Sequence, residues 1–526
     1  MTGNSQSELA GISRRSIFRG GATLLGGLGA TSLGATASPF RSLPGNGSAS
    51  ANDLANQTQR TLRWVGPAQA DWVIPRAGVD HNVVVVGGGQ SGVGISYWLA
   101  RKGVGRVSTI DESEPGKAGV WRTIARMHVL NTSKLQAGPA RDDVALGFRA
   151  WYEALHGPRA FNAMERVPRL AWADYLDWFQ KTASVQVRYR TCLLDVEPDG
   201  DVLRLHIESN GVERIETTRK LVLATGYLGS GGPNLPDNIR TLPGHLWAHS
   251  SGYIDFPALA GKVVGVLGAG SSAFDAAATA LESKAVQVHL FSRRPDIEYT
   301  GNPSSAPSAL NASYHSPGPL DLAGYLPDGV RWNNERVRNR ASASVTLPAI
   351  ERVVGSDRFY LHVNSPWDST AVADDGKVAV KTPTNSFHFD YVIAGTGYRT
   401  DMSLRKELAR IHGTILLWGE HYRAAPGEEN PAAKTYPYLG EGFQFQAREG
   451  TDANYLRNIH CFNPAGLLSF ESQVGNIGSS VYYPALVDAI ARDLYLEGID
   501  PSASKQLLAA PPQVSSDPSV YRRAIR

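Results

Sequence analysis

The chain contains short apolar runs that end at or near glycine. Residues 82–86 (Asn-Val-Val-Val-Val) are too short for a helix, and their β-branched side chains predict a buried strand of a parallel sheet. Residues 91–102 have apolar positions at helical spacing, and residues 106–111 form a second β-branched run. This order predicts a strand–helix–strand unit of the βαβ type.

A second unit with the same order follows about 180 residues later. A strand is predicted over 263–267, a helix over 273–282 and another strand over 286–291. Two further apolar runs, 221–227 and 391–398, end in glycine turns, and we expect the chain to pass between two domains there. The pattern predicts an α/β fold with two Rossmann-like dinucleotide-binding domains.

The first unit carries the turn Gly87-Gly88-Gly89-Gln90-Ser91-Gly92 (G-x-G-x-x-G) between its strand and its helix. Glycine at these positions permits a tight turn, close approach to a pyrophosphate and close packing of the helix. Asp111, backed by Glu112, ends the next strand, where a carboxylate accepts hydrogen bonds from an unphosphorylated ribose. The pattern predicts FAD, with Gly87, Gly89, Gly92, Asp111 and Glu112 as ligands.

The second unit carries the turn Gly268-Ala269-Gly270-Ser271-Ser272-Ala273. Its second strand ends in Ser292-Arg293-Arg294, and a guanidinium is a planar, charged donor for a 2′-phosphate. The pattern favours NADPH over NADH, while a solvated pair of surface arginines is the alternative. The predicted ligands are Gly268, Gly270, Ser271, Ser272, Ala273, Ser292, Arg293 and Arg294.

Composition completes the expected domain organisation. Residues 38–77 are rich in Ser, Ala, Asn, Gln and Pro without a sustained period, which is typical of a linker. We expect a signal segment over 1–37, a linker over 38–79, an FAD-binding domain over 80–250 and 390–500, an NADPH-binding domain over 251–389 with an irregular insertion over 300–346, and a tail over 501–526.

Charge and cysteine content argue against several kinds of site. Lys plus Arg exceeds Asp plus Glu by 52 − 49 = 3, and no long basic run is present, which argues against nucleic acid as a partner. Cys192 and Cys461 form no C-x-x-C pair or Cys/His cluster. His245 and His249 are four residues apart, but no third ligand accompanies them, so no metal site is predicted.

The first residues resemble a twin-arginine export signal. Ser13-Arg14-Arg15-Ser16-Ile17-Phe18-Arg19 precedes a glycine-rich, weakly apolar stretch and the small residues Ala35-Thr36-Ala37. This predicts export of the folded protein by the twin-arginine (Tat) machinery to the periplasm or the cell exterior. A basic tail on a cytoplasmic protein is the alternative. No stretch reaches the roughly 20 apolar residues that a bilayer requires, so no transmembrane helix is predicted.

Three further segments resemble the class B flavoprotein monooxygenases, which include flavin-containing, N-hydroxylating and Baeyer–Villiger enzymes. Ala118-Gly119-Val120-Trp121 is similar to the family's glycine-and-tryptophan turn, and Asn131-Thr132-Ser133-Lys134 is similar to a segment beside the flavin ring. Residues 244–253 resemble the fingerprint F-x-G-x-x-x-H-S-x-x-Y. The resemblance extends from about residue 83 to residue 495.

The resemblance implies an enzyme in which NADPH reduces FAD, dioxygen forms a C4a-hydroperoxyflavin, and one oxygen atom passes to a small organic substrate. Asn131 and His249 are the implied catalytic residues: Asn131 would hold the oxygenated flavin, and His249 would orient the linker between domains. A helix beginning after residues 473–480 would direct its N-terminus at the flavin. Further implied cofactor ligands are Trp121, Lys134, Thr225, Gly226, Thr396, Gly397 and Asn476.

The fingerprint departs from the family pattern in three ways. Leu242 or Pro243 stands where phenylalanine is expected, one extra residue separates Gly244 from His249, and Tyr253-Ile254-Asp255 lacks the tryptophan typical of Baeyer–Villiger enzymes. The sequence therefore favours heteroatom or ring hydroxylation over ester formation. Asn131 has an alternative role as well, because Asn-Thr-Ser is a common turn or helix cap.

Two other classes of function remain open. An oxidase or quinone reductase that uses FAD and NAD(P)H would share this fold without inserting oxygen, whereas a disulfide reductase would need a C-x-x-C pair that the sequence lacks. A non-catalytic flavin-binding module, such as a redox sensor, is the second alternative. The sequence also leaves a homodimer open.

Overall fold

The computed structural model describes residues 51–499, apart from 67, 137, 301–322, 341–344 and 472–473, together with residues 502, 519, 522 and 523. The expected signal segment, the start of the expected linker and parts of the expected insertion and tail lie outside these residues. All the elements described below belong to one unit of the chain, Ser48–Arg526.

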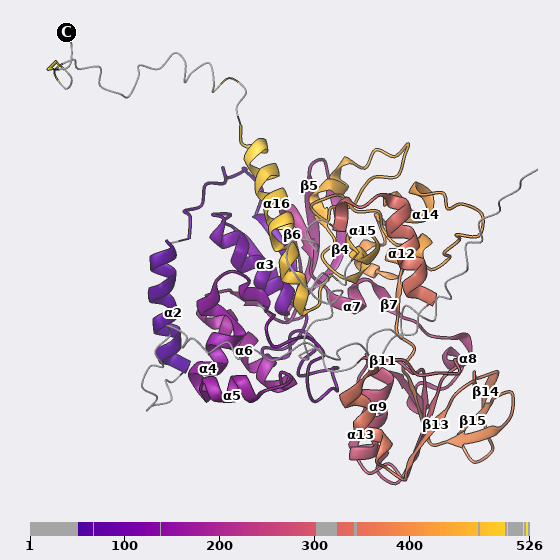
Figure 1. Ribbon diagram of the computed structural model, residues 1–526. Helices are drawn as coiled ribbons and strands as arrows, with labels where there is room; N and C mark the ends of the chain where they lie inside the picture. Colours follow the sequence, from indigo (N-terminus) through magenta and orange to yellow (C-terminus); the bar gives the residue numbers. More distant parts are fainter. Residues whose placement is uncertain are drawn as a thin grey trace, which may run out of the picture. The chain divides into compact units, whose positions relative to one another are not determined.

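The larger sheet has seven strands within the described residues, in the order β3-β2-β1-β6-β5-β4, with β19 beside β6. Three of these strands, β4, β5 and β6, are labelled in Figure 1. Val83 of β1 pairs in parallel with Val107 of β2 and with Lys220 of β6, while β5 and β4 continue the sheet in antiparallel fashion. The strands are β1 His81–Val86, β2 Val107–Ile110, β3 Val187–Arg188, β4 Thr191–Asp199, β5 Val202–Ser209, β6 Val212–Leu223 and β19 Ile459–His460.

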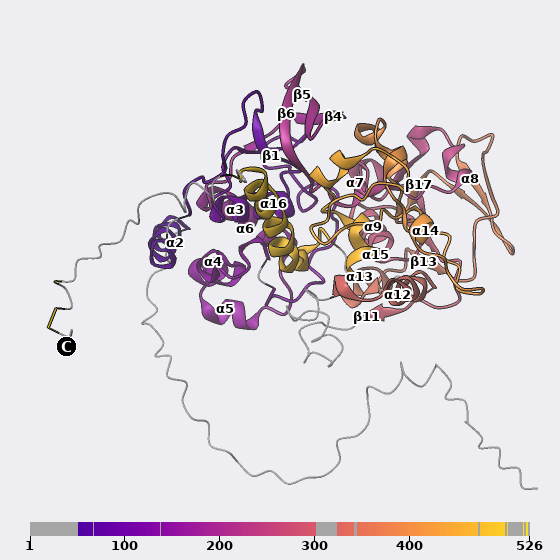
Figure 2. The same cartoon turned by 90° about the horizontal axis from the view of Figure 1, so that it is seen from above.

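Helices α3 (Gln90–Arg101) and α16 (Tyr483–Glu497) contact each other and share one hydrophobic core with this sheet (Figures 1 and 2). Ile95 and Leu99 of α3 and Ile490 of α16 are fully or almost fully buried in that core. Val83, Val84 and Val85 have no exposed surface, which explains why their strand is apolar at every position. The predicted first βαβ unit is therefore confirmed.

The second sheet has five parallel strands within the described chain, in the order β13-β10-β9-β17-β8. Helices α9 and α13 share a core with residues of one face, and the strands β15 and β16, which form an antiparallel sheet with β14, supply residues to a second core. The elements are β8 Trp247–His249, β9 Val263–Leu267, α9 Ser271–Glu282, β10 Gln287–Phe291, α13 Leu347–Val354, β13 Phe359–His362, β14 Ser369–Val372, β15 Val378–Lys381, β16 Ser386–Phe389 and β17 Tyr391–Ala394. The second βαβ unit is also confirmed.

The chain passes between the two sheets twice, as the glycine turns predicted. It leaves β6 through α7 (Gly226–Gly229), β7 (Gly231–Pro233) and α8 (Asp237–Arg240), and it returns after β17 through β18 (Tyr398–Thr400), which pairs with β7. β8 and β17 both belong to the second sheet. That sheet consequently begins before the expected boundary at 250 and continues beyond the one at 389.

The expected linker contains a helix, α2 (Ala51–Val65). Leu54 and Thr58 of α2 are buried, and Leu62 packs beside them at the same helical spacing. They adjoin an aromatic cluster built by α4 (Phe148–His156) and α6 (Arg169–Thr182), to which the short helix α5 (Pro158–Ala163) adds Phe161. The linker prediction was wrong for these residues because the buried stripe has only one residue per turn and its middle residue, Thr58, is polar.

The expected insertion over 300–346 is not irregular throughout, because residues Asp328–Arg340 form helix α12. Trp332 is buried, and its Nε1 donates to the carbonyl oxygen of Glu428 at 2.8 Å. The guanidinium of Arg331 lies 5.0 Å from the ring centre of Trp418. α12 therefore packs against residues that follow the second sheet in sequence. The smaller elements nearby are β11 Tyr299–Thr300, β12 Val345–Thr346, α14 Trp418–His421 and α15 Leu467–Phe470.

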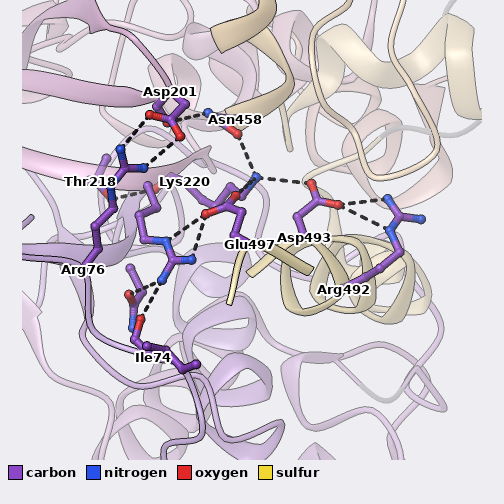
Figure 3. Close-up of polar contacts among 11 residues, drawn as sticks. Ile74, Arg76, Asp201, Thr218, Lys220, Asn458, Arg492, Asp493 and Glu497 are labelled. Carbon is purple, nitrogen blue, oxygen red and sulfur yellow. Dashed lines mark hydrogen bonds and ion pairs between the residues drawn. The ribbon is translucent and has the colours of Figure 1, made fainter. Parts of the chain in front are cut away.

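A network of charged side chains ties α16 to the larger sheet (Figure 3). Lys220 of β6 is 1% exposed, and its Nζ lies 2.7 Å from Oδ1 of Asn458, 3.2 Å from Asp493 and 3.3 Å from Glu497. Arg219 donates twice to Oε2 of Glu497, at 3.0 and 2.8 Å.

No helix within the described residues combines the length and the apolar character needed to cross a bilayer.

Candidate active site

The first glycine turn joins β1 to α3 and leaves no room for side chains. Gly87 has a φ of +111°, and a Cβ atom on it would lie 2.4 Å from the carbonyl oxygen of Ala224. A Cβ on Gly92 would lie 1.7 Å from the carbonyl oxygen of Gly87. Because α3 begins at Gln90, its free N–H groups lie at this turn, where they suit the pyrophosphate of a dinucleotide.

Asp111 follows β2 and is held against the same turn. Its Oδ2 accepts a hydrogen bond from the N–H of Gly88 at 2.6 Å, and its Oδ1 accepts from the N–H of Ser113 at 2.8 Å and from the Ser113 hydroxyl. Beside the turn is a cavity whose lining includes Gly88, Gly89 and Tyr189. The glycine cradle and the fixed carboxylate fit the ADP part of FAD. Glu112 is exposed and lies 3.8 Å from Sγ of Cys192.

Segments that are far apart in sequence meet near this turn. The hydroxyl of Tyr483 donates to the carbonyl oxygen of Gln90 at 3.4 Å, which joins the start of α16 to the start of α3. A Cβ on Gly478 would lie 3.2 Å from Oε1 of Gln136 and 3.4 Å from Oδ1 of Asn476. The loop that carries Asn131 therefore adjoins the loop that carries Asn476, and the Asn131 side chain is exposed.

The end of β6 belongs to the same group of segments. Nδ2 of Asn463 donates to Oγ1 of Thr225 at 3.1 Å and to the carbonyl oxygen of Gly229 at 3.3 Å. Gly226 has a φ of +63°, which favours glycine. Asn463, Gln136 and Tyr483 were not predicted from the sequence. Only Asn463 carried a local signal, since an asparagine before proline often caps a turn, and its side chain does accept from the N–H of Ala465.

Two ligands implied by the resemblance have other partners in the structure. The ammonium of Lys134 donates to the carbonyl oxygens of Phe161, Asn162 and Met164, at 2.9, 3.1 and 2.7 Å. These contacts use all three N–H donors, so Lys134 anchors its loop to the end of α5. Trp121 is half-buried and packs against the aromatic cluster of α4 and α6, although Gly119 in its turn does approach Gly89.

The helix expected to begin near residue 481 has a different start. Residues Ile477–Tyr482 form a turn of 3-10 helix, and the α-helix α16 begins at Tyr483 with Pro484 in its first turn. The side chain of Asn476 makes no capping hydrogen bond there, while its carbonyl oxygen accepts from the hydroxyl of Ser479 at 2.6 Å. The N–H groups nearest to Asn476 thus come from the 3-10 turn.

The second glycine turn repeats the construction of the first. Gly268 has a φ of +115°, and a Cβ on it would lie 2.2 Å from the carbonyl oxygen of Gly395. A Cβ on Gly395 would lie 2.6 Å from the Cβ of Ala273, which explains the small residue at the third position of the turn. Gly270 directly precedes α9, which begins with Ser271 and Ser272, so free N–H groups again lie at the turn.

The residues that follow β10 fit a phosphorylated ribose. Ser292 is buried, and its hydroxyl accepts a hydrogen bond from the N–H of Arg294 at 3.1 Å. Arg293 is exposed and Arg294 is half-buried. No ion pair of either guanidinium is found among the described residues, and a planar, charged guanidinium suits the 2′-phosphate of NADPH.

His249 is the last residue of β8, and its side chain is buried. Its Nδ1 lies 2.6 Å from the hydroxyl of Ser251 and accepts from the Ser251 N–H at 3.1 Å, and its ring lies 5.8 Å from that of Tyr398. Burial lowers the pKa of His249 to about 4, so the ring is neutral at physiological pH. His245 is exposed in a 3-10 turn, and the two histidines therefore share no helical face.

Thr396 and Gly397 lie where the chain returns from the second sheet. The hydroxyl of Thr396 donates to the carbonyl oxygen of Asn234, and the N–H of Asn234 donates to the carbonyl oxygen of Gly397 at 2.9 Å. These two predicted cofactor ligands thus fasten the two crossings of the chain to each other. Two Rossmann-type domains, one with a carboxylate after its second strand and one with two arginines at the equivalent place, define a flavoprotein oxidoreductase that uses both FAD and NADPH.

Comparisons with known proteins identify the family. A family model described as FAD-NAD(P)-binding matches residues 84–228, and the model for L-lysine 6-monooxygenase/L-ornithine 5-monooxygenase matches residues 160–353. The chain is 36% identical over 453 residues to an FAD-dependent urate hydroxylase of Xanthomonas campestris pv. campestris, a match that covers 84% of this chain and 93% of that protein. The chain belongs to the same family, within the class B flavoprotein monooxygenases.

Solved structures share the fold. The ornithine N-hydroxylase of Kutzneria sp. 744 is 15% identical with a TM-score of 0.63, over 78% of this chain and 99% of that one. The ornithine hydroxylase of Pseudomonas aeruginosa is 20% identical with a TM-score of 0.61, over 79% and 99% of the two chains. The 36% identical relative and the two matching family models, and not these structures, identify this chain as an NADPH-consuming flavin monooxygenase that transfers one oxygen atom of dioxygen to a small organic substrate.

Bound FAD supplies the redox chemistry: it accepts a hydride from NADPH and activates dioxygen. The chain's own groups place the reactants. The N-termini of α3 and α9 would hold the two pyrophosphates, Asp111 would hold the first ribose, and Arg293 and Arg294 would hold the phosphorylated ribose. The ring of His249 is held in place by the Ser251 hydroxyl at 2.6 Å, and burial keeps it uncharged near pH 7.

The two arginines should determine the preference for NADPH. We expect Arg293→Ala combined with Arg294→Ala to raise the KM for NADPH by about 10- to 100-fold, because a hydrogen bond to a charged group contributes roughly 1.5–3 kcal/mol. The KM for NADH should stay unchanged. Lys262→Ala is the control, since Lys262 is exposed and directly precedes β9, whereas Arg293 and Arg294 follow the C-terminal end of the parallel strand β10. Equal losses with both nucleotides would disprove the assignment.

Proposed function

We propose that this monooxygenase hydroxylates a planar nitrogen heterocycle related to urate. The observation that carries the proposal is the 36% identity to a urate hydroxylase over most of both chains. The departures of residues 242–255 from the Baeyer–Villiger fingerprint support ring hydroxylation as well, because they remove the tryptophan typical of ester-forming enzymes.

The side chains gathered near the first turn support this substrate class. Asn131 and Asn476 offer amide donors and acceptors, which suit the N–H and C=O edges of a heterocycle. The buried amide of Asn463 is instead used within the protein, by Thr225, Gly229 and Ala465. Within the described residues of segments 131–136, 225–229, 463–471 and 474–483, the one carboxylate is Glu471. It is already engaged by Arg338 at 2.8 Å and by Asn334 at 3.1 Å.

An amine substrate would require a different set of residues. The ammonium group of ornithine, lysine or cadaverine needs a carboxylate partner in a dry site, because burying an unpaired charge is costly. The segments named above provide no free carboxylate among the residues that the structure describes. The site therefore favours a neutral or anionic heterocycle over a diamine or an amino acid.

Oxygen-18 labelling tests this proposal. Purified protein with FAD and NADPH is incubated under ¹⁸O₂ with urate, ornithine, lysine or cadaverine, and NADPH consumption and product mass are measured. We expect urate to stimulate NADPH oxidation and to yield a product that carries one ¹⁸O atom. Stimulation and labelling by an amine alone would overturn the heterocycle assignment, and peroxide release with every compound would overturn it too.

We also propose that the chain is exported folded by the twin-arginine route, which the pattern of residues 13–37 supports. Replacing both Arg14 and Arg15 by lysine should retain the protein in the cytoplasm, as cell fractionation would reveal. If the unmodified chain were found only in the cytoplasm, with its first residues intact, this route would be ruled out.

A homodimer stays a prediction, which size-exclusion chromatography tests.

A further inference from the structure

Arg126 lies in the loop that leads from the first βαβ unit to Asn131. Its side chain contacts residues that follow β8, where the chain has crossed from the larger sheet to the second sheet. Its Nη1 donates to the carbonyl oxygen of Ile124 at 2.7 Å and to that of Ser250, and its Nη2 donates to that of Gly252 at 2.9 Å. The guanidinium also lies 5.2 Å from the ring centre of Phe256. Ser250, Gly252 and Phe256 all follow β8 of the second sheet.

The partly buried Arg126 guanidinium donates these hydrogen bonds to backbone carbonyl oxygens, and none of them goes to a carboxylate. Arg126 forms no ion pair within the described part of the chain, and burial lowers its pKa. Losing water around a charge costs free energy that the three carbonyl hydrogen bonds must offset, so these bonds fix the loop in one position relative to the crossing.

A second arginine continues this connection into the second domain. Nη1 of Arg352, on α13, donates to the carbonyl oxygen of Arg126 at 3.0 Å and to Oδ1 of Asp275 at 2.8 Å. Its Nε and Nη2 each donate to Glu282 at 2.9 Å. The Arg352 side chain is 10% exposed, and that of Asp275 is 4% exposed.

These contacts connect the two cofactor sites. Asp275 and Glu282 belong to α9, the helix whose N-terminus forms the second glycine turn, and α9 packs against α13 (Figure 1). Arg126 is five residues before Asn131, in the loop that adjoins the Asn476 segment. An unbroken series of hydrogen bonds thus leads from the NADPH-binding helix, through Arg352 and Arg126, to the loop beside the flavin site and to the crossing after β8.

We propose that Arg126 and Arg352 are positioning residues that set the distance between the nicotinamide and the flavin. Neither residue is placed to touch a reacting atom. Hydride transfer needs the two rings in close and aligned contact, and a displacement of about 1 Å can slow such a step by about 100-fold. A misplaced nicotinamide also leaves the oxygenated site less protected from water, so peroxide release should rise.

Arg126→Met tests the proposal, with Arg126→Lys as the conservative variant and Arg122→Met as the matched control. Methionine keeps the length of the side chain but donates no hydrogen bond, while lysine can retain one carbonyl contact. Arg122 is in the same loop and pairs with Asp174 and Asp177 of α6 at 2.7 Å each, so it reaches only the first domain. The readouts are the rate of anaerobic flavin reduction by NADPH, peroxide formed per NADPH, FAD content and thermal stability.

We expect Arg126→Met to retain FAD and thermal stability, to reduce its flavin at least about 10-fold more slowly, and to release more peroxide. Arg126→Lys should be intermediate, and Arg122→Met should behave as the unmodified protein. If Arg126→Met does not fold, Arg352→Lys should show the same kinetic change, since lysine cannot reach Asp275, Glu282 and Arg126 together. The proposal would be overturned if the folded variants, Arg126→Met or Arg352→Lys, had the same flavin reduction rate and the same peroxide yield as the unmodified protein. These readouts need no substrate, so they do not depend on the urate assignment.

Discussion

A Gly92→Ala variant is expected to lose its flavin. The added Cβ would lie 1.7 Å from the carbonyl oxygen of Gly87, so α3 would have to move away from β1 and carry its N-terminal N–H groups with it. Overpacking of this kind costs up to about 3 kcal/mol, which corresponds to roughly a 100-fold weaker affinity for FAD. The FAD content of the purified variant and its dissociation constant for added FAD measure the effect.

Gly268→Ala is the corresponding change in the second glycine turn. Its Cβ would lie 2.2 Å from the carbonyl oxygen of Gly395, and a φ of +115° strains any side chain, so the second turn alone should be damaged. The variant should remain yellow but require much more NADPH for reduction. Gly355→Ala is the control, because Gly355 has a φ of −81° and open space around it. A Gly92→Ala protein with normal flavin content would contradict the assignment of the first turn.

Lys220→Ala is expected to lower the free energy of unfolding by about 3 kcal/mol, because it breaks a buried charge network. The value lies at the low end of the range for such networks, since Asp493 and Glu497 keep some contact with water. The substitution leaves Oδ1 of Asn458 without its 2.7 Å donor and loosens α16. Since Tyr483 at the start of α16 contacts Gln90, FAD retention should fall as well. Urea denaturation followed by fluorescence measures the loss.

Lys102→Ala is the matched control for Lys220→Ala. Lys102 pairs with Asp488 of the same helix α16 at 2.7 Å, but both side chains are about half exposed, so the loss should be within about 1 kcal/mol. Equal destabilisation by the two substitutions would show that the buried network contributes nothing beyond a surface ion pair.

The βαβ units could be predicted closely because their signals are local. A run such as Val83–Val86 followed at once by glycine fixes the strand end, and β9 has the predicted bounds Val263–Leu267. Helix α2 escaped prediction because its stripe of Leu54, Thr58 and Leu62 is weak, and α12 because its buried Trp332 stands among polar residues. Their stability comes from tertiary packing and not from local preference.

The candidate site also contains residues with a local sequence signal and residues without one. Asp111 was predicted from its distance to a glycine turn, and the structure holds it against Gly88. Arg126 and Arg352 carried no sequence signal, because their 3.0 Å contact joins residues 226 positions apart. Lys134 was assigned to the flavin by resemblance alone, but carbonyl oxygens around the end of α5 already occupy its ammonium. Such roles follow from which chain segments meet, which no single segment determines.

Mixing the purified protein with NADPH in the absence of oxygen tests most directly whether the two turns hold their cofactors face to face. The yellow colour of the bound flavin should bleach when NADPH is added, and it should bleach at far lower concentrations of NADPH than of NADH. A colourless protein that takes up no added FAD, or a bound flavin that stays oxidised with NADPH, would contradict this structure-based assignment.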